Sequence, residues 1–140
     1  MDDPYATIGF ALKQAQHALR THMDAGLRQI GLTTPQYAVL ACLKVQPGAS
    51  NAALARQAFV TPQTMQAILV TLEKSGFIKR TPHPDHGRVQ KTALTPAGGQ
   101  ALMAASAIVA EAENRLVAAA APLDPDLVAP MLMRLTNALR

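Results

Sequence analysis

Hydrophobic residues recur at steps of three and four along the N-terminal part of the chain. This spacing places them on one face of a helix, which we expect to run from about Pro4 to Ile30. The apolar positions are Ile8, Leu12, Ala15, Leu19, Met23, Leu27 and Ile30. The pattern therefore predicts a long amphipathic helix at this end of the chain.

Four later helix starts share one arrangement, a hydroxyl or carboxylate residue followed directly by proline. The side chain can accept a hydrogen bond from a backbone N–H of the first turn, and proline at the first helical position has no N–H to leave unpaired. The pairs are Thr34-Pro35, Thr61-Pro62, Thr95-Pro96 and Asp124-Pro125. Ser50 can cap a further short helix that continues to about Ala58.

The helix that begins at Thr61 has an apolar face and a polar face. Its core side is expected to consist of Met65, Ile68, Leu69 and Leu72, which are spaced at i, i+3, i+4 and i+7. The opposite side carries Gln63, Gln66, Ala67, Val70 and Lys74. This side has two amides and one cation, so it is either an ordinary solvated surface or a face suited to a DNA groove.

After Gly76, a residue type that commonly ends helices, the hydrophobic period changes. The segments "FIKRT" and "RVQKTAL" flank the turn-rich stretch "PHPDHG", which predicts a short β-hairpin. The hairpin is the most cationic part of the chain; its basic and imidazole residues are Lys79, Arg80, His83, His86, Arg88 and Lys91. A short helix, a turn, a second helix and a basic hairpin in this order predict a helix-turn-helix with a wing.

Composition agrees with one domain that has an anionic partner. The 140 residues are 49% hydrophobic, enough for one core, and the net charge of +4 with a pI near 9.6 favours a polyanion. The start of the chain lacks the features of a signal peptide, no window resembles a membrane span, and Cys42 is the only cysteine. We therefore expect a cytoplasmic protein that does not enter membranes.

The chain resembles the MarR (multiple antibiotic resistance regulator) family of bacterial transcription factors. The resemblance rests on "GLTTPQYAVLACL", "NAALARQAFVTPQTMQAILVTLEKSGFIKR" and "HGRVQKTALTPAG", in this order, and covers nearly the whole chain. It implies a homodimer that binds palindromic double-stranded DNA, usually as a repressor released by a small, often phenolic ligand or by oxidation. The expected fold is mainly α with a small β component: a winged helix-turn-helix lobe at 33–98 and dimerisation helices at 4–30 and 99–140 within a single domain, 1–140.

The resemblance also implies which residues bind DNA. Thr61 opens the recognition helix, and Arg88 corresponds to the arginine of the wing. Together with the charge pattern, it predicts DNA contacts from Thr61, Pro62, Gln63, Thr64, Gln66, Ala67, Lys74, Arg80, His86 and Arg88. The family's frequent aspartate two residues before the wing arginine is replaced here by His86, and Asp85 lies one residue earlier. Either residue remains a possible partner for Arg88.

A ligand site is expected at the seam between the winged lobe and the dimerisation helices, because such seams often form pockets. Its predicted lining residues combine apolar bodies with polar or polarizable groups, as a small aromatic acid or phenol requires. They are Tyr5, His17, Met23 and Tyr37. Each residue taken singly also fits a plain core or surface role.

Other chemistry is poorly supported by the sequence. Cys42 lies among apolar residues and is interpreted as a buried, inert thiol rather than a peroxide sensor. His83 and His86 have too few further ligands nearby for a zinc site. No Gly-rich phosphate loop, nucleophile elbow or His–carboxylate group indicates an enzyme, and no cofactor is expected. The remaining alternative is a winged-helix protein-interaction module that has lost specific DNA binding; DNA affinity and its salt dependence would separate the two.

Overall fold

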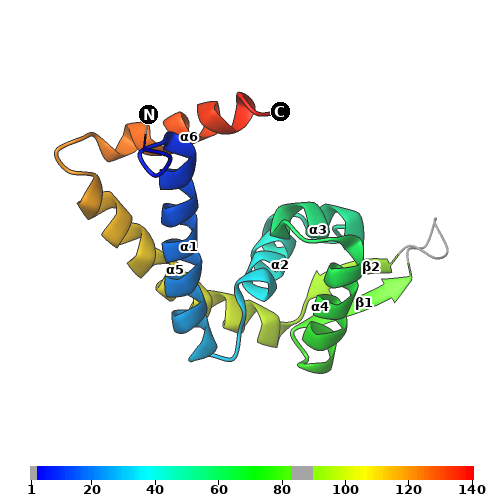
Figure 1. Cartoon of the computed structure of the whole chain (residues 1–140). Coiled ribbons are helices and arrows are strands. Elements are labelled where there is room, and N and C mark those ends of the chain that lie inside the picture. The colour runs from blue at the N-terminus through cyan, green and yellow to red at the C-terminus, as the bar shows by residue number, and fades with distance from the viewer. Residues whose placement is uncertain (1–2, 83–89) are drawn as a thin grey trace.

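The computed structural model describes residues 3–82 and 90–140, which form six α-helices, one 3₁₀ turn and two strands. Most of the chain is helical, and the strands make one small antiparallel sheet (Figure 1). The elements in chain order are α1 (Ile8–Arg28), α2 (Thr34–Val45), α3 (Asn51–Ala58), α4 (Pro62–Lys74), β1 (Ile78–Pro82), β2 (Gln90–Leu94), α5 (Pro96–Ala120), η1 (Pro125–Leu127) and α6 (Val128–Asn137).

The first helix is shorter than the apolar stripe predicted. It begins at Ile8 rather than near Pro4, because the Thr7 side chain accepts a hydrogen bond from the N–H of Phe10 and caps the helix there. It ends at Arg28, and Gly31, three residues later, adopts a left-handed conformation with φ +77°. The expected amphipathic helix is thus confirmed, with both ends moved inward.

Helix caps account for most of the other boundaries. Ser50, Thr61 and Thr95 each accept a hydrogen bond from a backbone N–H in the first turn, as predicted. The prediction for α2 was wrong by one residue, because Thr33 is the cap and its main-chain N–H donates to the side chain of Gln36 in return. Asp124 caps the 3₁₀ turn that precedes α6.

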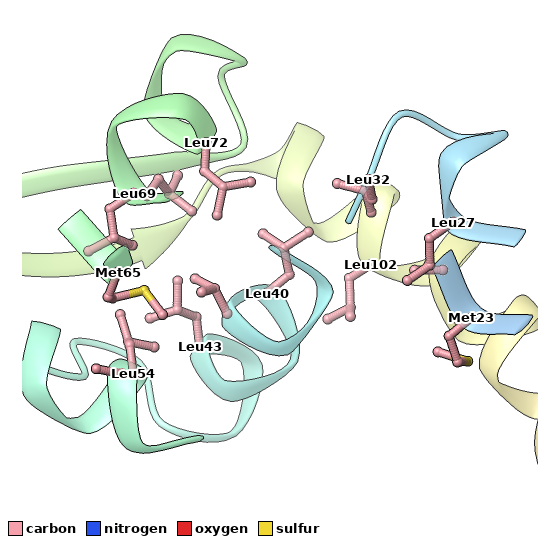
Figure 2. Close-up of a cluster of buried hydrophobic side chains, with 14 of the residues drawn as sticks. Met23, Leu27, Leu32, Leu40, Leu43, Leu54, Met65, Leu69, Leu72 and Leu102 are labelled. Carbon is pink, nitrogen blue, oxygen red and sulfur yellow. The ribbon is translucent and has the colours of Figure 1, made fainter. Parts of the chain in front are cut away.

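The core lies where α2, α3, α4 and the hairpin meet, and it extends along α5 to the second half of α1 (Figure 2). Met65, Leu69 and Leu72 of α4 are almost fully buried, which confirms the predicted core face of that helix. They pack with leucines of the neighbouring helices, chiefly Leu40, Leu43 and Leu54. Helix α4 is therefore buried along one side only, and its other side is exposed.

The two strands pair in the register expected of a hairpin. Ile78 lies opposite Leu94 and Pro82 lies opposite Gln90. The segment 83–89 between the strands lies outside the described residues. Thr95 joins the hairpin to α5, since its N–H donates to the Phe77 carbonyl and its hydroxyl donates to the Gly76 carbonyl at 2.6 Å. The hairpin thus follows directly from α4 and leads directly into α5.

The helices outside the lobe extend away from it. Figure 1 shows the hairpin at one end of the molecule and the N-terminus with α6 at the other, and α1 packs against α5 between them. Gly26 allows this close crossing, because a Cβ there would lie 2.6 Å from Cγ2 of Ile108. Among residues 3–82 and 90–140, no single helix is long and apolar enough to span a membrane; only α5 and the η1–α6 segment reach that limit together, bent by 109°.

Candidate nucleic-acid interface

The outward face of α4 is a polar surface at the edge of the helix-turn-helix. Thr61, Pro62, Gln63 and Thr64 in the first turn are all exposed. One turn further along, Gln66 and Ala67 are exposed as well. No residue of the first α4 turn is acidic. Beyond the exposed first turn, Gln63, Gln66 and Ala67 lie along one side of the helix, a polar surface of the kind that can enter a major groove.

Arg80 ties the first strand of the hairpin to α4. Its Nη2 lies 3.3 Å from Glu73 Oε1, and its main-chain N–H donates to Glu73 Oε2 at 3.2 Å. Its Nη1 donates to Oε1 of Gln66 at 3.3 Å. Because the Arg80 side chain is only 13% exposed, its guanidinium faces the helix rather than solvent. Glu73 was not singled out from the sequence, although its spacing of seven from Gln66 puts both on one helix face.

The structure describes only some of the other basic residues that were predicted to contact DNA. Lys74, at the C-terminal end of α4, is exposed, as is Lys79 on β1. His86 and Arg88, predicted to contact DNA from the wing, lie outside the described residues, as do His83 and Asp85. Their assignment remains a prediction from the sequence.

A cavity of about 920 Å³ lies between the winged lobe and the long helices. Its size falls in the range of small-molecule sites. Several elements and their junctions surround it, and the lining residues are Gln16, Leu19, Arg20, Met23, Thr34, Pro35, Tyr37, Ala38, Gln57, Ala58, Phe59, Val60, Thr64, Val109, Ala112, Glu113 and Leu116. Thr64 belongs both to this wall and to the first turn of α4. The seam predicted from the sequence is thus a cavity that reaches the start of the recognition helix.

Two of the four predicted ligand residues line the cavity and two do not. Met23 and Tyr37 line the cavity, whereas Tyr5 and His17 do not. Tyr5 precedes α1 and packs edge-on against Phe10, with ring centroids 4.9 Å apart. His17 is exposed on α1, about a third of a turn or more away from the face that carries Leu19 and Met23.

Most residues of the cavity wall were not predicted from the sequence, and Phe59 and Val60 are among them. They follow the end of α3, where no helical periodicity continues and no local pattern indicates a pocket. Phe59 adopts a left-handed backbone conformation with φ +57°, which ends α3 and turns the chain toward α4. Their place in the wall therefore depends on the turn of the helix-turn-helix.

An acidic residue beside the cavity links α1 to α2. Asp24 accepts a hydrogen bond from the Thr34 hydroxyl and pairs with Arg20 Nε at 2.9 Å. The Thr34 hydrogen bond, and then Arg20, hold the pKa of Asp24 below its usual value. Since Arg20 and Thr34 both line the cavity, this network fixes part of its polar wall.

A second polar group, centred on Glu111, joins α1 to α5. His22 Nε2 lies 2.9 Å from Glu111 Oε2, and Arg115 also pairs with Glu111. The hydrogen bonds from His22 and Arg115 lower the pKa of the Glu111 carboxyl. The pair is exposed, so it orients the two helices more than it stabilises them.

Cys42 and the residue types that could bind a metal ion offer little further chemistry. Cys42 is half-buried rather than fully buried, because its side of α2 borders a shallow hollow with Val45 and Gln57. Within the described part of the chain, no three His, Cys, Asp or Glu residues are grouped closely enough to hold a metal ion.

The order α3, turn, α4 and two-stranded hairpin defines a winged helix-turn-helix protein. A sequence model described as the MarR family matches residues 32–89. The HTH-type transcriptional repressor Rv2887 of Mycobacterium tuberculosis is 37% identical over 113 residues, which span 81% of this chain and 81% of that protein. The chain belongs to the MarR family.

Solved structures share the architecture over almost the whole length. The MarR family protein Rv2887 of M. tuberculosis, in complex with salicylic acid, matches with a TM-score of 0.76 and 35% identity, covering 96% of this chain and 98% of that one. The transcriptional repressor CouR, bound to a 23-mer DNA duplex, matches with a TM-score of 0.82 and 27% identity over the full length of both chains. Rv2887 and CouR are both transcriptional repressors.

Proposed function

We propose that this protein is a sequence-specific DNA-binding transcriptional repressor and has no enzymatic role. The observation that carries the proposal is the exposed polar face of α4, with Gln63, Gln66 and Ala67 aligned beside a basic hairpin. Two amides and a methyl group are suited to reading base edges, and the hairpin cations suit phosphates or a narrow minor groove. The DNA complex of the related repressor CouR supports this use of the fold. Such a regulator acts in the cytoplasm, where a bacterial chromosome lies.

DNA binding by the purified full chain tests the proposal. We expect footprinting on DNA flanking its own gene to protect a palindrome whose half-site centres lie about 10 base pairs apart, because two recognition helices enter successive major grooves. Affinity should fall steeply with added salt as phosphate contacts are lost. Equal affinity for the flanking DNA and for random duplexes would instead favour a winged-helix interaction module without specific DNA binding.

The proposed active species is a homodimer formed through the terminal helices. The chain exposes 9874 Å², whereas a compact monomer of 14.8 kDa exposes about 7,000 Å². The long and terminal helices expose large apolar residues, which include Ile8, Leu116, Val117, Leu127, Met131 and Leu132. A second copy of the chain that covers these residues would bury an interface of the obligate class.

The proposed control is release from DNA by a small aromatic acid or phenol bound in the cavity. Its wall combines apolar residues such as Met23 and Val60 with Tyr37 and Arg20, which carry polar groups. The related Rv2887 complex with salicylic acid supports this ligand class. Titration of salicylate-like compounds against a preformed operator complex tests the proposal. Compounds that bind the protein but leave its DNA affinity unchanged would contradict it.

A further inference from the structure

The contact between Arg80 and Gln66 connects the wing strand to a side chain expected to read DNA. Glu73 holds the guanidinium through Oε1, and the same carboxylate receives the Arg80 main-chain N–H through Oε2. The remaining guanidinium edge donates from Nη1 to Oε1 of Gln66 at 3.3 Å. Gln66 lies two helical turns before Glu73, so one arginine spans the exposed edge of α4.

The chemistry of arginine fixes which way the Gln66 amide faces. A guanidinium has donors only, so the Gln66 atom turned toward Arg80 must be the carbonyl oxygen. The amide is planar, and its NH₂ group points away from the carbonyl. An exposed Gln66 held in this way presents donors to a ligand while its acceptor faces the protein.

This orientation changes which base the residue can read. A glutamine pairs with adenine by using both groups, since its oxygen accepts from N6 and its nitrogen donates to N7. With the oxygen held by Arg80, the NH₂ group can still donate to adenine N7, but no free acceptor remains for the N6 amino group, so one of the two adenine contacts is lost. Guanine presents two acceptors, N7 and O6, and thymine presents O4, so these bases fit a donor.

We propose that Arg80 is a positioning residue that makes Gln66 a reader of guanine or thymine and a discriminator against adenine. Arg80 acts through Gln66 and does not itself grip DNA, in agreement with its low exposure. The inference rests on the proposed function, because it concerns the specificity of the same helix. It replaces both the direct DNA contact predicted for Arg80 and the adenine contact that a free Gln66 would make.

The test measures base preference rather than affinity alone. The full-length chain and the variants Gln66→Met, Arg80→Met and Lys79→Met each select from a pool of randomised duplexes, and single-base variants of the selected site are then titrated. Gln66→Met identifies the position that Gln66 reads, because the preference there disappears. Lys79→Met is the matched control, since it removes one cation from the same strand at an exposed site without a contact to Gln66.

We expect the wild-type chain to prefer guanine or thymine over adenine at that position by about tenfold, the effect of one polar base contact. Arg80→Met should release the amide and raise the relative affinity for adenine there by about fivefold or more. Lys79→Met should weaken binding to all duplexes and keep the preference. A wild-type preference for adenine, or an unchanged preference in Arg80→Met, would overturn the inference.

Thermal melting of each variant shows whether it is folded, so that a loss of base preference is not mistaken for a loss of structure. If Arg80→Met does not fold, Arg80→Lys keeps the charge and the aliphatic stem, but a single ammonium does not span Glu73 and Gln66 as the planar guanidinium does. It should move the preference in the same direction, and an unchanged preference would again overturn the inference. A wild-type chain that selects no sequence contradicts the proposed function, whereas selection of a site with adenine at this position contradicts the inference alone.

Discussion

Gly98 is the residue on which the junction between the hairpin and α5 depends. A Cβ at this position would lie 2.0 Å from the Phe77 carbonyl oxygen, which is part of the backbone and cannot rotate away. We therefore expect Gly98→Ala to lower the free energy of unfolding by about 1–3 kcal/mol, as overpacking does. Gly99 is the control, because a Cβ there would meet nothing within 4 Å and alanine favours the helix. Urea unfolding should show Gly99→Ala to be neutral or stabilising; equal losses in both variants would contradict the expectation.

Asp24 should make stability depend on pH in a defined direction. The pKa of its carboxyl is lowered in the folded chain, chiefly by the Thr34 hydrogen bond, so the charged form stabilises the fold. That stabilisation is fully present above the unfolded pKa, near 3.8, and is lost as the pH falls through the lower folded value. Asp24→Asn should therefore be less stable than wild type between pH 5 and 7, roughly the range of full ionisation. The difference should shrink below pH 4, approximately, in urea titrations; a difference independent of pH would exclude this role.

Single residues also mark where prediction from the sequence succeeded. Thr61 and Thr95 were predicted as caps correctly, because a cap depends only on the few residues that follow it. At α2 two adjacent threonines compete, and the choice of Thr33 depends on the reciprocal bond with Gln36 and on the pairing of Thr34 with Asp24. The second of these contacts joins different helices, so the local pattern could not reveal it.

The polar face of α4 predicts two different kinds of mutational effect. Gln63→Ala should relax preference at one base pair by on the order of 1–3 kcal/mol and leave binding to random duplexes almost unchanged. Lys74→Ala removes a cation from the last turn and should weaken binding to all sequences, with a salt slope smaller by about 1. Fluorescence anisotropy on specific and random duplexes over a range of salt separates these outcomes. Equal losses on both duplexes for Gln63→Ala would show that this face does not read bases.

The elements of the lobe were predictable because their signals are local, but their mutual contacts were not. The apolar spacing of Met65, Leu69 and Leu72 correctly identified the buried side of α4. The link from Arg80 to Gln66 requires that β1 turn back beside α4, which no spacing along the chain specifies. The wing residues His86 and Arg88 lie outside the described residues, so their DNA contacts stay predictions.

At the scale of the whole molecule, the terminal helices should determine the oligomeric state. Met131 is 51% exposed on α6, in the apolar surface proposed to pair with a second copy. Met131→Glu would bury a carboxylate in that interface and should convert the dimer to monomer at micromolar concentration. Val45→Glu is the matched control, because Val45 is 80% exposed but lies on α2 in the lobe. Sedimentation should find that variant dimeric; a monomeric wild-type chain would contradict the proposed dimer.

The cavity shows why two of the four residues predicted to bind a ligand lie outside its wall. The seam was expected from the order of the elements, yet the residues that face it depend on how α1 is rotated where it crosses α5. Gly26 lies close to Ile108 at this crossing, and in the resulting arrangement Met23 lines the cavity whereas His17 does not. Sequence periodicity defines a helix face but not the partner to which it turns.

The place of Thr64 in both the cavity wall and the first turn of α4 has a thermodynamic consequence. If a ligand at this wall weakens operator binding by a given factor, the operator must weaken ligand binding by the same factor, because the two equilibria form a closed cycle. Calorimetric titration of salicylate into the free protein and into its operator complex should therefore give dissociation constants whose ratio equals the ligand-induced loss of DNA affinity. The operator would then act as an antagonist of the ligand. Repressor bound to DNA would have a lower affinity for the ligand than free repressor, and would need a higher ligand concentration to respond.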